Sequence, residues 1–128
     1  MQTFKLTERA IQPGCHLIEV EGEVDMGVAD QLSDAIDRAA AEHDRILIGL
    51  QRCEFIDSTA IAVIVHAHNQ MANQGKRIAV YGASSQVHRV LAITGLTQNG
   101  LAFDTADEAL AAPTGNAGQE EAVVDIPG

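Results

Sequence analysis

A continuous apolar run within residues 45–50 (RILIGL), set between two segments of helical periodicity, restricts the fold of this chain more than any other feature. Such a run is typical of a central strand that is covered on both faces. Further short strands are predicted at residues 15–20, 76–81 and 101–103. Because strands that alternate with helices imply right-handed crossovers, we predict one α/β domain. Its mixed, largely parallel sheet should contain four to five strands, with about four helices.

The helices are predicted at residues 29–41, 58–73, 85–94 and 106–112. In the first, Leu32 and Ile36 begin an apolar stripe that is opposite a polar, mostly acidic face. The second should turn five side chains inward, namely Ile61, Ile64, Val65, His68 and Met71. Residues 113–128 are small, polar and acidic with Pro and Gly, which predicts a flexible C-terminal tail after a domain at 1–112.

Three predicted loops follow parallel strands, at residues 21–28, 51–57 and 82–84. The carboxyl ends of parallel strands meet at one edge of a sheet, and open α/β sheets usually build their sites there. We therefore expect any functional site among these three loops.

Composition excludes several classes of partner. Eight basic and 18 acidic residues give a net charge of −10, and aromatic residues make up only 3% of the chain. Such a surface repels phosphate backbones and anionic membranes and offers few rings for base stacking. We predict no nucleic-acid binding and no direct membrane insertion.

The chain is predicted to be cytoplasmic. Residues 1–9 contain no apolar run of signal-peptide length, and the longest strongly apolar stretch, residues 60–65, is too short to cross a bilayer. Cys15 and Cys53 have no CxxC spacing and lie near predicted strands, so we expect two buried, reduced thiols rather than a disulfide.

Motifs for cofactor chemistry are missing. No GxGxxG follows a strand, and Gly75-Lys76 lacks the flanking residues of a phosphate loop. His66 and His68 are two residues apart on a predicted helix, so their side chains diverge and do not chelate one ion. We predict no catalytic residue, no metal and no cofactor.

The segment at residues 54–61 (EFIDSTAI) joins a predicted buried strand to an apolar-faced helix. Asp57 or Ser58 suits the N-cap of that helix, where a side-chain oxygen accepts from free backbone N–H groups. On spacing alone this segment is a capping sequence.

Three segments nevertheless resemble the landmarks of a known family. They are residues 22–25 (GEVD), 55–61 (FIDSTAI) and 89–96 (RVLAITGL), in this order along the chain. Together they resemble STAS domains, and most closely the bacterial anti-sigma factor antagonists, over roughly residues 3–112. The middle segment is the most specific of the three.

The resemblance implies a protein that binds an anti-sigma factor, usually a serine kinase of the histidine-kinase-like ATPase type, and so frees a sigma factor. The Ser after the Asp of the middle segment is the phosphoacceptor in this family, and here that residue is Ser58. Thr59 is the second choice. Phosphorylation releases the partner, and a serine phosphatase resets the switch. Ser58 is then a substrate, and the protein is not an enzyme.

A partner that senses Ser58 is expected to cover the carboxyl-terminal edge of the sheet and the start of the second helix. Ala60 and Val63 lie off the inward stripe of that helix and should form an exposed apolar contact. The full set of predicted partner-binding residues is Glu23, Asp25, Met26, Gly27, Asp57, Ser58, Thr59, Ala60, Val63, Ala83 and Ser84.

Two positions depart from the family pattern. An Asp is common where Gly49 stands, and a Gly is common where Ala60 stands. Gly49 is expected to remove a carboxylate from the neighbourhood of the acceptor, and Ala60 to tighten the start of the helix. Both changes bear on whether a standard kinase phosphorylates Ser58 efficiently.

Two other functions remain open. A constitutive STAS-like scaffold, as a subunit of a transporter or signalling complex, would bind its partner whatever the charge on residue 58. A small enzyme or nucleotide binder would show turnover or ligand affinity without a partner, and the missing motifs count against it.

Overall fold

The computed structural model describes residues 4–12, 14–93 and 101–111. Five strands and four helices occur in these ranges. They are β1 (Phe4–Gln12), β2 (Cys15–Val24), α1 (Ala29–Glu42), β3 (Arg45–Ile56), α2 (Ser58–Asn73), β4 (Arg77–Tyr81), α3 (Ser85–Ile93), β5 (Ala102–Phe103) and α4 (Ala106–Ala111). The predicted fold class is confirmed. The predicted helix ends at 94 and 112, the end of the third landmark at 94–96 and the predicted tail at 113–128 lie outside the described residues.

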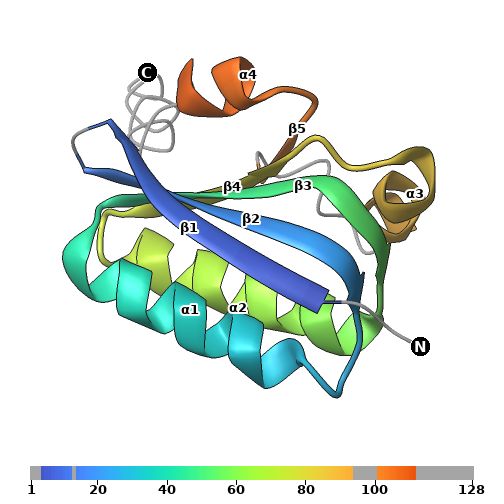
Figure 1. Cartoon of the computed structure of the whole chain (residues 1–128). Helices are drawn as coiled ribbons and strands as arrows, with labels where there is room; N and C mark the ends of the chain where they lie inside the picture. The colour runs from blue at the N-terminus through green and yellow to red at the C-terminus, as the bar shows by residue number, and fades with distance from the viewer. Residues whose placement is uncertain (1–3, 13, 94–100, 112–128) are drawn as a thin grey trace, which may run out of the picture.

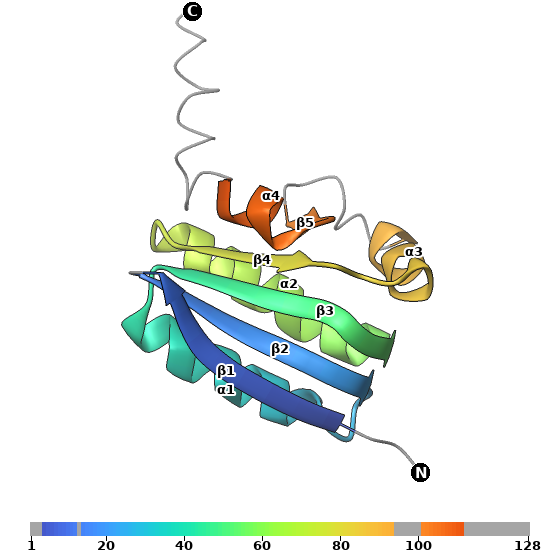
Figure 2. The same ribbon diagram turned by 45° about the horizontal axis from the view of Figure 1, so that its top comes forward.

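The strands form one mixed sheet in the order β1-β2-β3-β4-β5. β1 runs antiparallel to β2, and the other neighbouring strands are parallel. Helices α1 and α2 lie side by side on one face of the sheet, while α4 lies on the opposite face (Figure 1, Figure 2). α3 packs beside the carboxyl-terminal half of β3 (Figure 1). This topology brings the ends of β2 and β3 together beneath the first turn of α2.

The core confirms that β3 is covered on both faces. Ile48 packs with Leu32 of α1 and Ile64 of α2 in the main apolar cluster. Leu47, which points the other way, belongs to a smaller cluster with Ala109 of α4. Each large side chain buried in this way contributes about 1.5–3 kcal/mol relative to an exposed one. The two clusters fix β3 as the rigid centre of the fold.

The two long helices begin where they were predicted. α1 extends one residue past its predicted end, and α2 has its predicted bounds. Ile61, Ile64 and Met71 are buried as expected, whereas Val65 and His68 are half-buried. The stripe pattern therefore identified the face of α2 that packs on the sheet.

The first strand, β1, was not predicted. It is an edge strand of nine residues whose Phe4 and Leu6 pack, partly buried, against the main core. The rest of the strand is mostly exposed, so the alternation of apolar and polar residues is too short to stand out. Its conformation depends on pairing with β2 from Phe4↔Gly22 to Ala10↔His16, which is a tertiary interaction.

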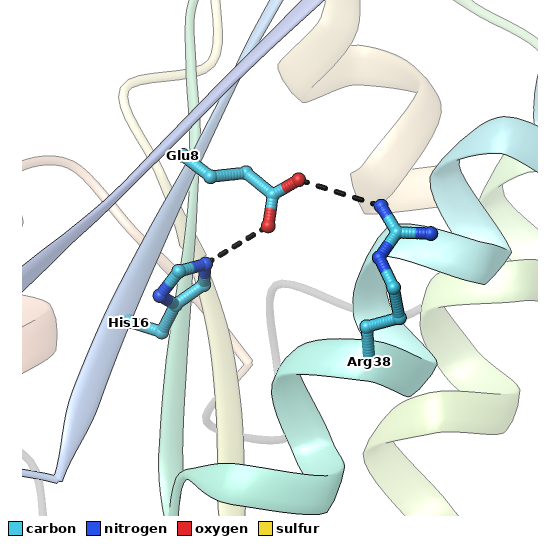
Figure 3. Close-up of polar contacts among 3 residues, drawn as sticks. All are labelled: Glu8, His16 and Arg38. Carbon is cyan, nitrogen blue, oxygen red and sulfur yellow. Dashed lines mark hydrogen bonds and ion pairs between the residues drawn. The ribbon is translucent and has the colours of Figure 1, made fainter.

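Polar side chains also tie β1 to the rest of the domain (Figure 3). Glu8 Oε1 lies 2.9 Å from Nε2 of His16 on β2, and Glu8 Oε2 lies 3.6 Å from the guanidinium of Arg38 on α1. Arg38, the one basic residue of α1, is thus directed toward the sheet edge.

Strands β2 and β3 are longer than predicted. They continue past residues 20 and 50 to Val24 and Ile56, so the expected loops at 21–28 and 51–57 shrink to 25–28 and the single residue Asp57. Register shifts after Glu19 and Gly22 interrupt the alternation of the paired strands, and Gly22 adopts a positive φ of 90°. These irregularities made an extended strand pair look like loops in the sequence.

Both cysteines are free and buried, as predicted. Burial raises the pKa of the Cys53 thiol to about 11, and burial also raises the pKa of Cys15 and of Tyr81. The unfolded chain releases these protons at lower pH than the folded chain does. The stability they contribute is therefore present below about pH 9 and lost as pH rises toward 11.

We expect the free energy of unfolding in urea to fall as pH rises from about 8.5 to 10.5. The Cys53→Ala variant should show a shallower fall, even though its stability at pH 8 is lower. Equal slopes for the two proteins would show that the Cys53 thiol does not carry the effect.

Candidate functional site

The junction between β3 and α2 is organised by Asp57. This residue is the N-cap of α2, with extended backbone (φ −100°, ψ 177°), and its Oδ1 accepts from the backbone N–H of Ala60 at 3.0 Å. Its own N–H donates to the carbonyl of Val24 at 3.0 Å, which continues the β2–β3 ladder. The capping role predicted for this segment is confirmed and belongs to Asp57.

The same carboxylate joins two loops. Oδ2 of Asp57 accepts from the backbone N–H of Met26 at 3.0 Å, across 31 residues of sequence. One side chain therefore holds the loop after β2 against the start of α2. No sequence pattern indicated this contact, because it depends on the lengths of both strands.

The loop at residues 25–28 is held by its own hydrogen bonds. Asp25 Oδ1 accepts from the N–H of Gly27 at 2.9 Å, and the Asp25 carbonyl accepts from Val28 and Ala29 at 3.1 and 3.0 Å. The loop presents Met26, whose side chain is 72% exposed. A fixed loop of this kind holds an apolar side chain in the solvent beside Asp57.

Ser58 follows Asp57 as the first residue of α2 and is exposed, as is Thr59. The helix N-terminus offers free N–H groups and the positive end of the helix dipole, which favour an anion. Both hydroxyl-bearing residues are thus open to a modifying enzyme. The fold does not need the Ser58 hydroxyl as the cap, because Asp57 supplies it.

Phe55 is a surface residue that the partner predictions left out. It lies on β3 opposite Glu23 of β2, and the residue is 46% exposed. Met26 and Phe55 are two of the three large apolar side chains that are well exposed among the described residues. An aromatic residue two positions before a helix cap, in an otherwise polar stretch, was the available signal.

Two of the predicted contacts from α2 differ from expectation. Ala60 is fully buried (0% exposed), so its expected role as an exposed contact is wrong. The Asp57 cap draws the first turn of α2 onto the core, and this turns Ala60 inward. Val63 is half-buried, packs against the core and lines a groove between α1 and α2.

Among the described residues, no hydrogen bond or ion pair joins the third predicted loop to Ser58. Ser84 Oγ accepts from the N–H of Val87 at 3.3 Å and so caps α3. Ser84 also lines a polar cavity with Arg52 and Glu54, on the flank of the extended β3 strand. Ala83 is half-buried against the core. The same cavity is lined by Glu21 and Gly22 of β2, so this loop lies beside the extended ends of β2 and β3.

Gly49 lies far from Ser58, so the expected loss of a carboxylate near that residue is wrong. Ile56 lies seven positions further along β3, a span of roughly 23 Å at about 3.3 Å per residue. Gly49 instead pairs with Tyr81 of β4, and a Cβ at position 49 would lie 2.9 Å from the Tyr81 hydroxyl oxygen. Glycine makes room for the tyrosine ring.

Within the described ranges, no group of three or more His, Cys, Asp or Glu side chains is arranged to hold a metal ion. The described helices include none whose length and apolar character suit a membrane span.

Removal of the Asp57 carboxylate tests its two contacts. We expect Asp57→Ala to lower the free energy of unfolding by about 1–2 kcal/mol, because the N–H groups of Ala60 and Met26 lose their acceptor. Asp57→Asn keeps one acceptor oxygen and should lose about half as much. Urea unfolding gives the energies, and hydrogen exchange should be faster at Met26. A change below about 0.3 kcal/mol in Asp57→Ala would contradict the assignment.

Comparisons with known proteins agree with this architecture. A family model described as "Mlab, STAS domain" matches residues 7–103. An anti-sigma F factor antagonist of Paenibacillus polymyxa is 31% identical over 87 residues, which cover 65% of this chain and 73% of that protein.

Solved structures show the same fold. An anti-sigma factor antagonist from Mycobacterium paratuberculosis has a TM-score of 0.76 at 23% identity, covering 84% of this chain and 92% of that one. A sulfate transporter family protein from Wolinella succinogenes has a TM-score of 0.67 at 23% identity, covering 80% and 87%. The family match spans the sheet, both long helices and the Asp57 junction, and the resemblance seen in the sequence is confirmed. The chain belongs to the STAS domain family.

Proposed function

We propose that this protein is an anti-sigma factor antagonist that is switched by phosphorylation of Ser58. The unphosphorylated form binds an anti-sigma factor, a serine kinase of the histidine-kinase-like ATPase type, and thereby frees a sigma factor for transcription. The kinase phosphorylates Ser58, the complex separates, and a serine phosphatase resets the protein. These steps take place in the cytoplasm, and the protein itself is a binding module without enzymatic activity.

The observation that carries the proposal is that Asp57 caps α2 and leaves the adjacent Ser58 exposed. Asp57 provides the cap and the link to the Met26 loop, while the adjacent Ser58 is exposed at the first position of α2. A phosphate there meets the helix N-terminus, so the modified domain is expected to stay folded. The relative from Paenibacillus polymyxa, named as an anti-sigma F factor antagonist, supports the class of partner.

Release follows from the surroundings of Ser58. A phosphate adds about −1.5 to −2 charges at neutral pH, in a region that already contains Asp25, Glu54 and Asp57. Arg52, the nearest cation in sequence, is paired with Glu21 at 3.5 Å. The new charge must then be desolvated by the docked partner. A tenfold loss of affinity needs only about 1.4 kcal/mol.

The proposed docking surface centres on this junction. Met26 and Phe55 supply exposed apolar area, and aromatic and Met side chains are enriched at such interfaces. The two segments that Asp57 joins also contribute Asp25, Gly27, Ser58 and Thr59 to this surface. Glu23 lies beside Phe55 on the neighbouring strand. We assign Ala83, Ser84 and Val63 to the margin of this proposed surface and leave out Ala60, because it is buried.

A paired pull-down tests the proposal. Ser58→Ala and Ser58→Asp proteins serve as baits in host lysate, and mass spectrometry identifies what each retains. We expect Ser58→Ala to retain a serine kinase of the ATPase type and Ser58→Asp to lose it. Equal capture of the same partner by both baits would overturn the switch.

A constitutive scaffold is the second candidate. It is favoured by the fold that this chain shares with the sulfate transporter family protein of Wolinella succinogenes and by Ala60, which stands where the family pattern has Gly. In this function the partner is bound whatever the charge on residue 58. The same pull-down separates the two candidates.

A further inference from the structure

A groove of about 320 Å³ runs between α1 and α2, beginning one residue beyond Ser58. Its walls are mainly apolar and include Ile36 from α1 and Ala62, Val63 and Ala67 from α2. Thr59 lies at the end nearest Ser58, and Asp37 stands on the α1 side. A space of this size accepts one or two aliphatic side chains, and its CH-rich walls favour them over polar groups.

The α1 side of the groove carries a stripe of negative charge. Asp30, Asp34 and Asp37 are spaced i, i+4 and i+7, so they follow one line along the helix, and all three are exposed. Within the described part of the chain, none of them forms an ion pair. Asp30 lies in the first turn of α1, where the helix dipole favours a carboxylate, but Asp34 and Asp37 lie beyond that turn. Like charges at these spacings destabilise a helix by a few tenths of a kcal/mol per pair.

Among the described residues, no Lys or Arg of the two helices forms an ion pair with this stripe. Arg38, the basic residue of α1, is directed to Glu8 on β1 (Figure 3). α2 contains no Asp, Glu, Lys or Arg in its 16 residues. The helical face of the domain therefore combines an apolar groove with an acidic border on the α1 side and, on the α2 side, a border that has no Asp, Glu, Lys or Arg and includes His66.

We infer that this groove is a docking site for a basic amphipathic helix of the partner. An aliphatic side chain of that helix enters the space between Ile36 and Val63, and Lys or Arg residues one turn away pair with Asp34 and Asp37. Helices that bind grooves in this way present apolar anchors at i, i+3 or i+4 and i+7. Charge complementarity selects the basic helix over an acidic one and raises the rate of association.

The inference deepens the proposed function, on which the identity of the partner rests. Thr59 lines the groove, so a helix seated there brings the partner over the start of α2. The acidic stripe lies on α1 and Ser58 on α2, so the two regions contribute differently to binding. The groove binds the partner whether or not Ser58 is phosphorylated, and the phosphate weakens the contact around Ser58.

Two synthetic helical peptides with the same leucine spacing serve as probes, one flanked by Lys and one by Glu. Amide chemical shifts of the full chain are followed by NMR at about 0.15 M salt, where long-range attraction is screened. We expect the Lys peptide to bind at least tenfold more tightly and to shift residues 33–37 and 59–67. The Asp34→Asn/Asp37→Asn variant should weaken its binding about fivefold.

Ala62→Glu and Ala41→Glu form a matched pair, since both place one extra carboxylate at an exposed alanine of a helix. Only Ala62 lines the groove. We expect Ala62→Glu to lower the affinity for the Lys peptide at least tenfold. Ala41→Glu should leave that affinity unchanged or raise it slightly. Equal effects of the two variants, shifts outside the groove, or equal binding of the two peptides would overturn the inference.

Capture of the kinase by each variant shows whether the groove inference or the proposed function has failed. Loss of capture with Ser58→Asp but not with Ala62→Glu would overturn the groove and leave the switch. Loss with Ala62→Glu but not with Ala41→Glu or Ser58→Asp would support the groove and overturn the switch.

Discussion

Ser58→Asp is expected to lower the affinity for the captured anti-sigma factor at least tenfold, whereas Ser58→Ala should change it less than twofold. The added carboxylate is next to Asp57, the docked partner is expected to exclude water there, and Arg52, the nearest cation in sequence, is already paired with Glu21. Isothermal titration calorimetry with the purified partner gives both dissociation constants. A tenfold change corresponds to about 1.4 kcal/mol.

Ser58→Asn is the matched control, because Asn has the shape of Asp without its charge. It should bind nearly as well as Ser58→Ala. All three variants are expected to fold, since Asp57 remains the cap and a helix N-terminus tolerates Asp, and circular dichroism checks this. If Asn weakened binding as strongly as Asp, size rather than charge would account for the loss, and the proposed phosphate effect would be contradicted.

Gly49→Asp is expected to lower the free energy of unfolding by about 3 kcal/mol or more. Gly49 is buried at the centre of β3, and a Cβ there would lie 2.9 Å from the hydroxyl oxygen and 3.1 Å from Cζ of Tyr81. The substitution forces the ring to move and also buries a carboxyl group without a partner. Urea unfolding followed by circular dichroism measures the loss.

A double-mutant cycle separates crowding from charge. Gly49→Ala alone should cost about 1–3 kcal/mol by overpacking, and Tyr81→Phe in that background should recover part of it because the nearest atom, the hydroxyl oxygen, is removed. If Gly49→Asp were as stable as the parent protein, the tyrosine ring would not occupy the space beside Gly49.

Local pattern was sufficient to predict the centre of the fold. The run at 45–50 and the stripes of α1 and α2 are strong signals, since burial on both faces or on one face leaves a distinct periodicity. The cap at Asp57 was also predictable, because it depends on residues within one turn. These features explain why the fold class could be predicted from the sequence, whereas the family was predicted from the resemblance of residues 22–25, 55–61 and 89–96 to STAS landmarks.

The remaining differences come from long-range contacts. β1 is half-exposed and is held by β2, so its nine residues carry little apolar signal of their own. The extended ends of β2 and β3 pair with each other through register shifts that have no sequence period. The link from Asp57 to Met26 follows from those strand lengths. The burial of Ala60 follows from the way the cap seats α2 on the core.

Phosphate mapping on the purified complex tests the central claim most directly. The protein and its captured kinase are incubated with ATP, and the phosphorylated residue is identified by mass spectrometry while the complex is followed by size-exclusion chromatography. We predict that one phosphate appears on Ser58 and that the complex dissociates at the rate at which Ser58 is phosphorylated. The complex with Ser58→Ala should stay intact and unmodified. A complex that persists with Ser58 fully phosphorylated, or that dissociates while Ser58 carries no phosphate, would contradict the proposed switch.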